Sequence, residues 1–302
     1  MRRYPVISVL CGVLALAGCG KPSDDQPAET PEVTLQLTLS FDTALPGHKT
    51  LDYPTKAGGA MMRHIVRVYD GDRLEREQVL TSANVSAPGA DLDFTLRAGR
   101  YRVLVWSDFV QGQAGQDWMW SAGNFARIGQ TGSYQGATPY KDAFCGSLDV
   151  NLSSSSSYAN GLVKMSRPLA KYSLTAADAS LFAGREITAT VTYGAPVPTV
   201  YNLLEKACTD TRDAVSYTCK PEIQADGTVL LAYDYLLVTG GETTVPLTLE
   251  LKEGSATLAS LPLSVPLHAG RETLFKGSVF TGSTSSGIVV DPDFDGDYQI
   301  DF

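Results

Sequence analysis

The stretch Val33-Thr34-Leu35-Gln36-Leu37-Thr38-Leu39-Ser40-Phe41 alternates apolar and polar side chains without a break. Successive side chains of a β-strand point to opposite faces, so a period of two places all the apolar residues on one side. We therefore predict a strand with one face in a hydrophobic core and the other in solvent. A helix would scatter these residues around its surface, so the stretch favours a β fold.

The same period recurs along the chain in short segments separated by turn residues. Asp70-Gly71-Asp72 supplies one turn, and residues 92–106 read as a hairpin that turns at Ala98-Gly99. Further strands are expected at residues 65–69, 74–80, 144–152, 186–193, 228–238, 244–252, 256–263 and 272–280. Short strands at close spacing indicate antiparallel β-sandwiches, and the chain is therefore predicted to be all-β.

The length of 302 residues is enough for two such sandwiches in tandem. Pro168 marks a change of register between the two sets of strands, so the boundary is expected near residue 170. We predict an N-terminal sandwich over residues 32–170 and a C-terminal sandwich over residues 171–302.

The first 18 residues have the layout of a secretory signal that ends at Cys19. Arg2 and Arg3 are followed by the apolar run from Val6 to Leu16 and by two small residues, and the order Leu-Ala-Gly-Cys predicts a lipidated cysteine. A diacylglyceryl group with an amide-linked chain, such as palmitate, would anchor the protein stably to a membrane. The alternative is an ordinary signal peptide with an incidental cysteine.

Residues 19–31 are predicted to form a flexible tether because they are rich in proline and charge and hold no aliphatic side chain larger than alanine. Without Arg2 and Arg3, the chain has 22 basic and 33 acidic residues, a net charge of about −11. Nucleic acid is therefore not expected as a partner, since it requires clustered basic charge. Ser23-Asp24-Asp25 resembles the acidic surface-export signal of Bacteroidetes lipoproteins, which implies an outward-facing location.

Three cysteines remain after the signal and Cys19. Cys208 and Cys219 flank a polar segment and are the candidate disulfide, with Cys145 left over. The alternative is that all three are small buried apolar residues.

We find no pattern that predicts catalysis or a cofactor. The histidines are His48, His64 and His268, in unrelated contexts, and HExxH, GxSxG and phosphate-binding glycine patterns are missing from the sequence. Asp291, Asp293 and Asp295 imitate the start of a calcium loop, but the twelfth position is Phe302 instead of glutamate. An acidic turn between strands is the favoured reading of that segment, and no metal site is predicted.

The region 111–141 interleaves glycines with aromatic residues and is expected to form a long loop region that can include one short strand. Trp118, Trp120 and Tyr134 could stack on sugar rings at a surface. The alternative role is to cover the edge of a sandwich core.

Several stretches in the same order resemble the fimbrillin and minor-fimbrium-anchor lipoproteins of Bacteroidales, which are related to type V pili. The resemblance runs from about residue 60 to the C-terminus, and each motif alone is weak. The stretches that carry it are Arg97-Ala98-Gly99-Arg100-Tyr101-Arg102-Val103-Leu104-Val105-Trp106, Lys141-Asp142-Ala143-Phe144-Cys145-Gly146, Arg167-Pro168-Leu169-Ala170-Lys171-Tyr172, Asp234-Tyr235-Leu236-Leu237-Val238, Pro266-Leu267 before Arg271-Glu272-Thr273, and Gly287-Ile288-Val289-Val290-Asp291-Pro292.

This resemblance implies two transthyretin-like sandwiches in a non-catalytic surface lipoprotein of the outer membrane, which acts in fimbriae and adhesion. Its partners would be other fimbrial subunits, bound by strand addition to a sheet edge. Residues 33–41 would be the displaced strand, and Lys49, Lys56 and Arg63 are candidate processing residues in the following loop. Anchor-type members keep this strand uncut. The segment 288–302 is read either as a donor strand or, preferably, as the last strand of its own domain.

Two functions are therefore expected, in order of preference. The first is a structural or anchor component of fimbriae that binds other subunits by strand addition. The alternative is a surface glycan-binding lipoprotein that uses the aromatic residues of region 111–141.

Overall fold

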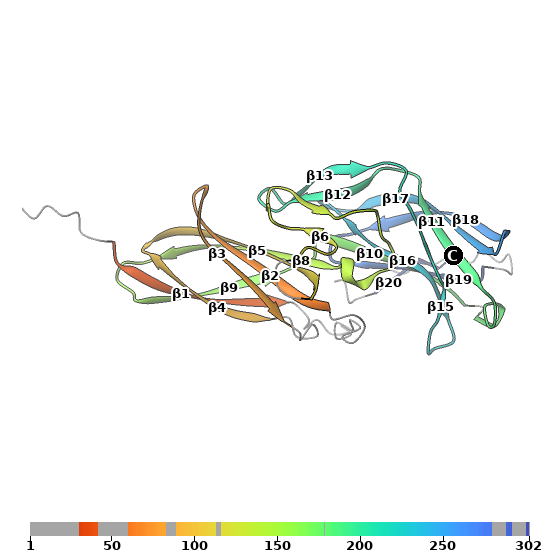
Figure 1. Ribbon diagram of the computed structural model, residues 1–302, viewed down its shortest axis with the longest axis horizontal. Helices are drawn as coiled ribbons and strands as arrows, with labels where there is room; N and C mark the ends of the chain where they lie inside the picture. The colour runs from red at the N-terminus through yellow and green to blue at the C-terminus, as the bar shows by residue number, and fades with distance from the viewer. Residues whose placement is uncertain are drawn as a thin grey trace, which may run out of the picture.

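The computed structural model describes residues 30–41, 60–82, 89–112, 116–177, 179–279, 288–291 and 300–301. Most of these residues lie in strands, which confirms the all-β prediction. The molecule is elongated, with two β-sandwiches placed end to end and a smaller sheet beside the junction (Figure 1).

Sandwich 1 has seven strands between residues 32 and 165. One sheet has the order β4-β1-β9 and the other the order β3-β2-β5-β8. The strands are β1 (Glu32–Phe41), β2 (Ala60–Asp70), β3 (Arg73–Ser82), β4 (Ala90–Arg97), β5 (Gly99–Gln111), β8 (Ala143–Leu152) and β9 (Tyr158–Met165).

Sandwich 2 repeats this arrangement with a second set of seven strands. One sheet contains the order β16-β10-β19 and the other has the order β14-β11-β17-β18. Three short strands, β15, β20 and β21, extend the first of these sheets. The bounds are β10 (Leu169–Ala176), β11 (Ile187–Tyr193), β14 (Ser216–Cys219), β15 (Glu222–Ile223), β16 (Val229–Leu237), β17 (Thr243–Glu253), β18 (Ala256–Leu267), β19 (Glu272–Gly277), β20 (Ile288–Asp291) and β21 (Ile300–Asp301), with a 3-10 turn at η2 (Ala179–Leu181).

The two sandwiches match strand for strand in chain order, from β1 and β10 at the start to β9 and β19 at the end. In both, the first and last strands pair in parallel, β1 with β9 and β10 with β19. Most strand pairs are antiparallel, as predicted, and these two parallel pairs are exceptions that both sandwiches share. Alternating hydrophobicity determines which face of a strand is buried but leaves its partner and direction open.

The predicted hairpin over residues 92–106 is also wrong. β4 pairs with β1 and β5 pairs with β2 and β8, so the turn at Ala98-Gly99 carries the chain from one sheet to the other. The hairpin between β2 and β3 is confirmed, and Gly71 in its turn has a φ of 57°, a conformation that glycine adopts at little cost.

A third sheet lies beside the junction and is made from insertions. Its order is β13-β12-β7-β6, where β6 (Trp120–Ser121) and β7 (Ile128–Gln130) come from between β5 and β8. β12 (Val197–Asn202) and β13 (Ala207–Arg212) come from between β11 and β14. We call it the junction sheet; β7 pairs with β12 and thereby joins an insertion of sandwich 1 to one of sandwich 2.

Each sandwich has its own apolar core, and a third core lies under the junction sheet. This junction core combines β2, β5 and β8 of sandwich 1, β10 and β16 of sandwich 2, and the insertions. Its largest fully buried side chains include Trp106 and Trp120, whose rings meet edge to face at 5.9 Å. The sandwiches are therefore packed against each other through a continuous apolar contact.

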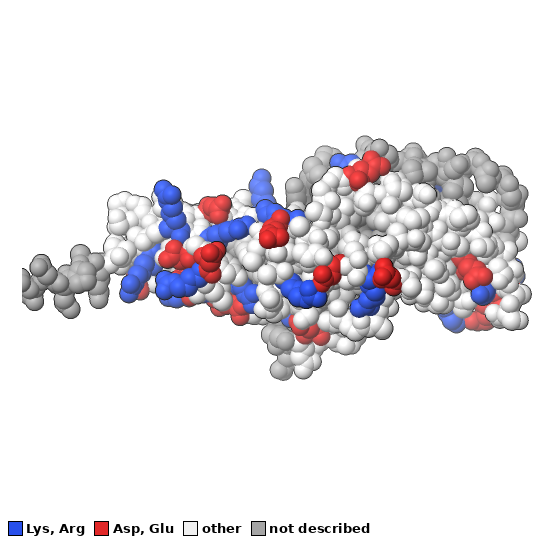
Figure 2. Space-filling view, turned by 90° about the horizontal axis from the view of Figure 1, so that it is seen from above, with Lys and Arg blue, Asp and Glu red and all other residues white. Residues whose placement is uncertain are grey.

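The charged side chains on the molecular surface are mixed in sign. Figure 2 shows Lys and Arg interspersed with Asp and Glu over sandwich 1, whereas most of the visible face of sandwich 2 carries neither. This face has no continuous basic patch of the kind that binds nucleic acid.

Candidate functional site

β1 lies in the middle of its sheet and is held on both sides. It pairs with β4 antiparallel over eight residues and with β9 in parallel over eight residues. Four aliphatic side chains on its inner face are at most 1% exposed, and they are Val33, Leu35, Leu37 and Leu39. β9 approaches closely, since a Cβ placed on Gly161 would lie 3.0 Å from the Leu37 Cδ1 atom.

A single stretch of chain, residues 42–59, joins β1 to all the later strands. Lys49 and Lys56, two of the predicted processing residues, fall in this stretch and lie outside the described residues. A backbone cut there would leave β1 held by hydrogen bonds and apolar contacts alone. Its departure would open a groove between β4 and β9 that reaches into the core of sandwich 1.

Arg63, the third predicted processing residue, is not in a loop. It lies within β2, and its side chain is 3% exposed. Its guanidinium donates two hydrogen bonds to Asp108, at 2.8 and 2.7 Å, and one to Asp117 at 2.8 Å. The expectation of an accessible loop at Arg63 is wrong, because the strand needs a buried cation opposite the fully buried Asp108 carboxylate of β5.

Asp234 of β16 is the centre of a second buried polar cluster, between sandwich 2 and the insertion of sandwich 1. Lys141, in the 3-10 turn η1 (Pro139–Lys141), donates from Nζ to the Asp234 Oδ1 atom at 2.8 Å. The Tyr134 and Tyr193 hydroxyls both donate to Oδ2, the latter at 2.7 Å. The backbone N–H of Tyr235 donates to Oδ1 at 2.7 Å. We call these residues the Asp234 cluster.

The cluster continues through further tyrosines into sandwich 2. The Tyr172 hydroxyl lies 2.8 Å from the Tyr193 hydroxyl and 3.0 Å from the Tyr217 hydroxyl. The Tyr217 hydroxyl in turn donates to the carbonyl of Tyr233 at 2.9 Å. Burial raises the pKa of all three hydroxyls well above its ordinary value, as does the nearby Asp234 charge. They therefore remain protonated and act as donors at physiological pH.

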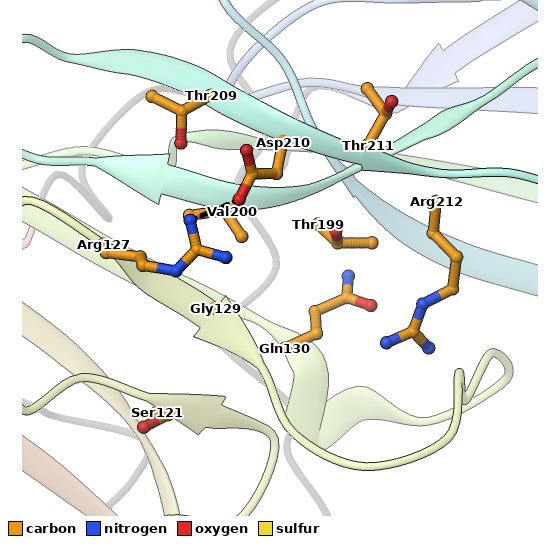
Figure 3. A pocket seen from close by; sticks show the side chains of 10 residues that line it. All are labelled: Ser121, Arg127, Gly129, Gln130, Thr199, Val200, Thr209, Asp210, Thr211 and Arg212. Atoms are coloured by element: carbon orange, nitrogen blue, oxygen red, sulfur yellow. Dashed lines mark ion pairs between the residues drawn. The ribbon is translucent and has the colours of Figure 1, made fainter.

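The junction sheet carries a polar pocket of about 800 Å³. Arg127 forms an ion pair with Asp210 on one side of it, and Gln130 and Arg212 lie on the other, as Figure 3 shows. The Gln130 Nε2 atom is buried without a hydrogen-bond partner, and Arg212 donates to the carbonyl of Gly132 at 3.3 Å. The remaining lining residues are Ser121, Gly129, Thr199, Val200, Thr209 and Thr211.

The aromatic residues of region 111–141 are largely used inside the protein. Trp120 is fully buried and donates from Nε1 to the carbonyl of Lys141 at 3.0 Å. Tyr134 is half-buried, with its hydroxyl turned inward onto Asp234. Trp118 is half-buried against Tyr140, at a ring distance of 4.4 Å. Trp120 is therefore not available to stack on a sugar, and the region covers the junction core instead.

The predicted disulfide between Cys208 and Cys219 is not formed. Cys208 lies in the junction sheet and Cys219 in a sheet of sandwich 2, and both are free thiols, as is the buried Cys145. The Cys219 thiol donates to the carbonyl of Leu231 at 3.4 Å, and burial raises its pKa to about 11. Between the two cysteines the chain passes from β13 of the junction sheet to β14 of sandwich 2. The spacing of the cysteines in the sequence did not reveal this change of sheet.

Several predicted features lie outside the described residues. These are the signal, Cys19 and the tether up to residue 29, together with His48, Asp293 and Asp295. Asp291 ends β20, and its side chain is not described. Within the described ranges, no three His, Cys, Asp or Glu side chains gather as metal ligands would. Among those same ranges, none of the helices has the length and apolar character required to cross a bilayer.

The two buried ionic clusters were missed in the sequence, although a signal was present. Asp108 interrupts the largely apolar run VLVWSDFV of β5, and Asp234 interrupts the apolar run LLAYDYLLV of β16. A carboxylate in such a position is costly unless it is paired, so each predicts a buried partner. The identity of the partners, Arg63 and Lys141, depends on contacts 45 and 93 residues apart along the chain.

Solved structures share this fold at low sequence identity. A candidate cell adhesion protein from Bacteroides ovatus gives a TM-score of 0.52 at 12% identity, over 89% of this chain and 97% of that one. A candidate polysaccharide-binding protein from Bacteroides thetaiotaomicron gives 0.51 at 9% identity, over 86% and 96%. The fimbrial anchor protein Mfa2 from Porphyromonas gingivalis gives 0.45 at 11% identity, over 85% and 97%. The first two likenesses describe the fold alone, and no inference is drawn from the third.

No curated protein matches the sequence. A family match covers residues 28–302, which includes both sandwiches and the junction sheet between them. The chain therefore belongs to DUF6562, a family of unknown function.

Proposed function

We propose that this protein is a non-catalytic structural or anchor component of fimbriae, which binds other subunits by β-strand addition and serves in adhesion. Lipid on Cys19 would hold it to the outer membrane, facing outward. The shared fold with the candidate cell adhesion protein from Bacteroides ovatus supports this role. The observation that carries the proposal is the position of β1, central in its sheet yet tied to the other strands through residues 42–59 alone.

Strand addition needs a site where a new backbone can pair and where apolar side chains can enter pockets. The β1 position provides both, because β4 and β9 would each offer free backbone groups once β1 left. The pockets vacated by its four aliphatic side chains are spaced at every second residue. An incoming strand with alternating aliphatic residues would fill them in the same way.

Limited digestion followed by peptide exchange tests the proposal. Trypsin should cut at Lys49 or Lys56 while Arg63 stays intact, and the cut protein should then exchange β1 for a labelled peptide of residues 32–41. A matched peptide with Leu35→Asp and Leu37→Asp should fail to enter, because charge cannot be buried in these pockets. A cut protein that takes up neither peptide, or both equally, would overturn strand addition at this site.

A second candidate function is capture of an acidic glycan in the pocket of the junction sheet. Arg212, the unpaired Gln130 amide and three threonine hydroxyls offer hydrogen bonds there, and guanidinium groups favour carboxylates. Titration calorimetry with oligogalacturonate against neutral oligoglucose tests it. Binding of the acidic sugar alone, weakened at least tenfold by Arg212→Gln, is expected, and equal or no binding of the two sugars would reject it.

A further inference from the structure

Lys141 and Asp234 are placed for a reaction with each other. The Lys141 Nζ atom lies 2.8 Å from Asp234 Oδ1, and the two side chains are 2% and 1% exposed. Lys141 comes from the insertion of sandwich 1 and Asp234 from β16 of sandwich 2, so the pair bridges the two halves of the molecule. Strand addition and glycan capture make no use of this pair.

The two carboxylate oxygens of Asp234 have different surroundings. Oδ2 accepts hydrogen bonds from the Tyr134 and Tyr193 hydroxyls, which could stabilise negative charge on that oxygen. Oδ1 faces the Lys141 ammonium, the donor that could deliver protons to it. One oxygen is thus arranged to remain as a carbonyl and the other to leave as water.

We propose that Lys141 and Asp234 condense into an isopeptide bond that covalently links the insertion of sandwich 1 to sandwich 2. The ammonium first transfers a proton to Oδ1, and the neutral amine attacks Cγ. In the tetrahedral adduct the charge resides on Oδ2, held by the two tyrosine hydroxyls. A second proton passes from nitrogen to Oδ1, the Cγ–Oδ1 bond breaks, and one water leaves. Both protons of that water come from the ammonium, so no other reactant is required.

The surroundings of the amine favour this step. Burial lowers the pKa of Lys141 against the opposing pull of Asp234, which increases the share of nucleophilic neutral amine. The Lys141 Nζ atom also lies 4.0 Å from the centre of the Tyr134 ring, which confines it beside the carboxylate. Exclusion of bulk water opposes hydrolysis of the amide once it has formed.

The chain contains a matched control pair. Lys171 Nζ and Glu272 Oε1 are also 2.8 Å apart, but Lys171 is 22% exposed and the Glu272 oxygen accepts from Ser173 instead of from tyrosines. Water reaches this pair, and no two tyrosine hydroxyls hold its carboxylate. We expect no covalent link between Lys171 and Glu272.

Mass spectrometry of the purified, denatured protein tests the proposal. The intact mass should be lower than the sequence mass by one water, and digestion should yield a branched peptide that joins Lys141 to Asp234. A mass with no loss of water, or a loss that maps to another site, would overturn it. This measurement is made on the unaltered chain, so it does not depend on the folding of any variant.

Two variants separate bond formation from packing. Lys141→Arg preserves the charge but removes the amine nucleophile, so the full mass should return. Tyr134→Phe removes one hydroxyl donor from Oδ2, and the water loss in freshly made protein should then be at least tenfold slower. Tyr201→Phe, which removes a buried hydroxyl of the junction core outside the Asp234 cluster, is the control and should leave that rate unchanged. Equal rates of water loss in the unaltered protein and in both tyrosine variants would contradict the role given to Tyr134.

Discussion

Sandwich 1 and sandwich 2 place equivalent strands, β1 and β10, in the middle of matching sheets but hold them by different means. The inner face of β1 carries only apolar side chains, four fully buried aliphatic ones and the half-buried Phe41 at the end of the strand. The inner face of β10 includes Tyr172, whose hydroxyl joins a network with Tyr193 and Tyr217. The backbone connects β10 at its start to β9 of sandwich 1, through residues 166–168, and at its end to the later strands of sandwich 2. Two backbone cuts would therefore be needed to release β10.

This difference shows how one strand order can serve two purposes. A row of aliphatic side chains can be replaced by any strand with the same alternation, because apolar contacts have no direction. A buried hydroxyl network accepts one arrangement, because each donor needs its own partner. Under the proposed function, sandwich 1 would exchange its first strand and sandwich 2 would retain it.

The sheet that contains β1 and the sheet that contains β10 also differ at their edges. The far side of β19 is covered by β20 and β21, whereas among the described strands none pairs with the far side of β9. An uncovered edge offers unpaired backbone groups to another strand. Under the proposed function, an incoming strand would therefore be expected at sandwich 1.

The largest effect is expected for Arg63→Met. This variant tests whether sandwich 1, like sandwich 2, depends on a specific buried polar contact, in this case the Arg63–Asp108 pair away from β1. We expect a loss of about 4 kcal/mol in the free energy of unfolding, since Asp108 would be left buried without its cation. Urea denaturation measures this loss. Arg67→Met, which disrupts a more exposed pair with Glu77, is the control and should cost less than about 1 kcal/mol.

The pH dependence of Arg63→Met is a second readout. Burial raises the pKa of Asp108 even beside Arg63, and without the guanidinium the pKa of this carboxyl should rise further. A carboxyl group with a raised pKa in the folded state binds protons more readily there, so the variant should regain stability as the pH falls toward 4. An equal loss at pH 7 and pH 4 would show that the buried charge is not the cause.

A sharper test of the two strands pairs Leu37→Ala in β1 with Leu174→Ala in β10. Both leucines are fully buried, so each variant should lose about 3 kcal/mol of unfolding free energy in the intact chain. After cleavage within residues 42–59, Leu37→Ala alone should speed the release of β1. Gln36→Ala, on the solvent face of β1, is the control for a substitution that leaves the core intact. Equal release in both leucine variants would remove the distinction between β1 and β10.

Acidification should weaken sandwich 1 through His64. Burial lowers the pKa of His64 to about 4, and its Nε2 atom has no hydrogen-bond partner. The unfolded chain binds the proton near pH 6.5, so stability is complete above that pH and is lost as the pH falls toward 4. Between pH 7 and 5 the loss should be about 2 kcal/mol. His64→Gln should remove this loss when the free energy of unfolding is measured by urea denaturation at pH 7 and pH 5. An unchanged dependence of the unfolding free energy on pH would exclude His64 as its source.

The smallest effect is expected for Tyr172→Phe in sandwich 2. Tyr193 keeps its bond to Asp234 and Tyr217 its bond to the Tyr233 carbonyl, so no buried donor is left unpaired. We expect a cost of about 1 kcal/mol in unfolding free energy. A cost above about 3 kcal/mol would mean that the network acts as one unit and would widen the contrast with β1.

Much of the fold could be predicted from local pattern. The alternation at residues 33–41 identified β1 and its buried face, and Asp70-Gly71-Asp72 identified the turn between β2 and β3. The partners of the strands could not be predicted in this way. β4 and β5 are adjacent in sequence but lie in different sheets, and β6, β7, β12 and β13 form a sheet from two distant insertions.

The same limit applies to the candidate site. The alternation of β1 and the basic residues after it are local features of the sequence, whereas exchange of this strand was implied only by the resemblance to fimbrillin lipoproteins. The sequence placed Arg63 in a loop, whereas Arg63 is buried against Asp108, 45 residues away. It left Trp120 open between stacking on sugars at a surface and covering a core, and the structure buries this side chain.

By itself, the sequence determined which residues form strands and which face of each strand avoids water, because these properties depend on the spacing of neighbouring side chains. The tertiary structure alone decided which strands pair, which insertions meet beside the junction, and which charges are buried together. Those choices depend on contacts between segments about a hundred residues apart, such as Tyr134 with Asp234, and no short pattern records them.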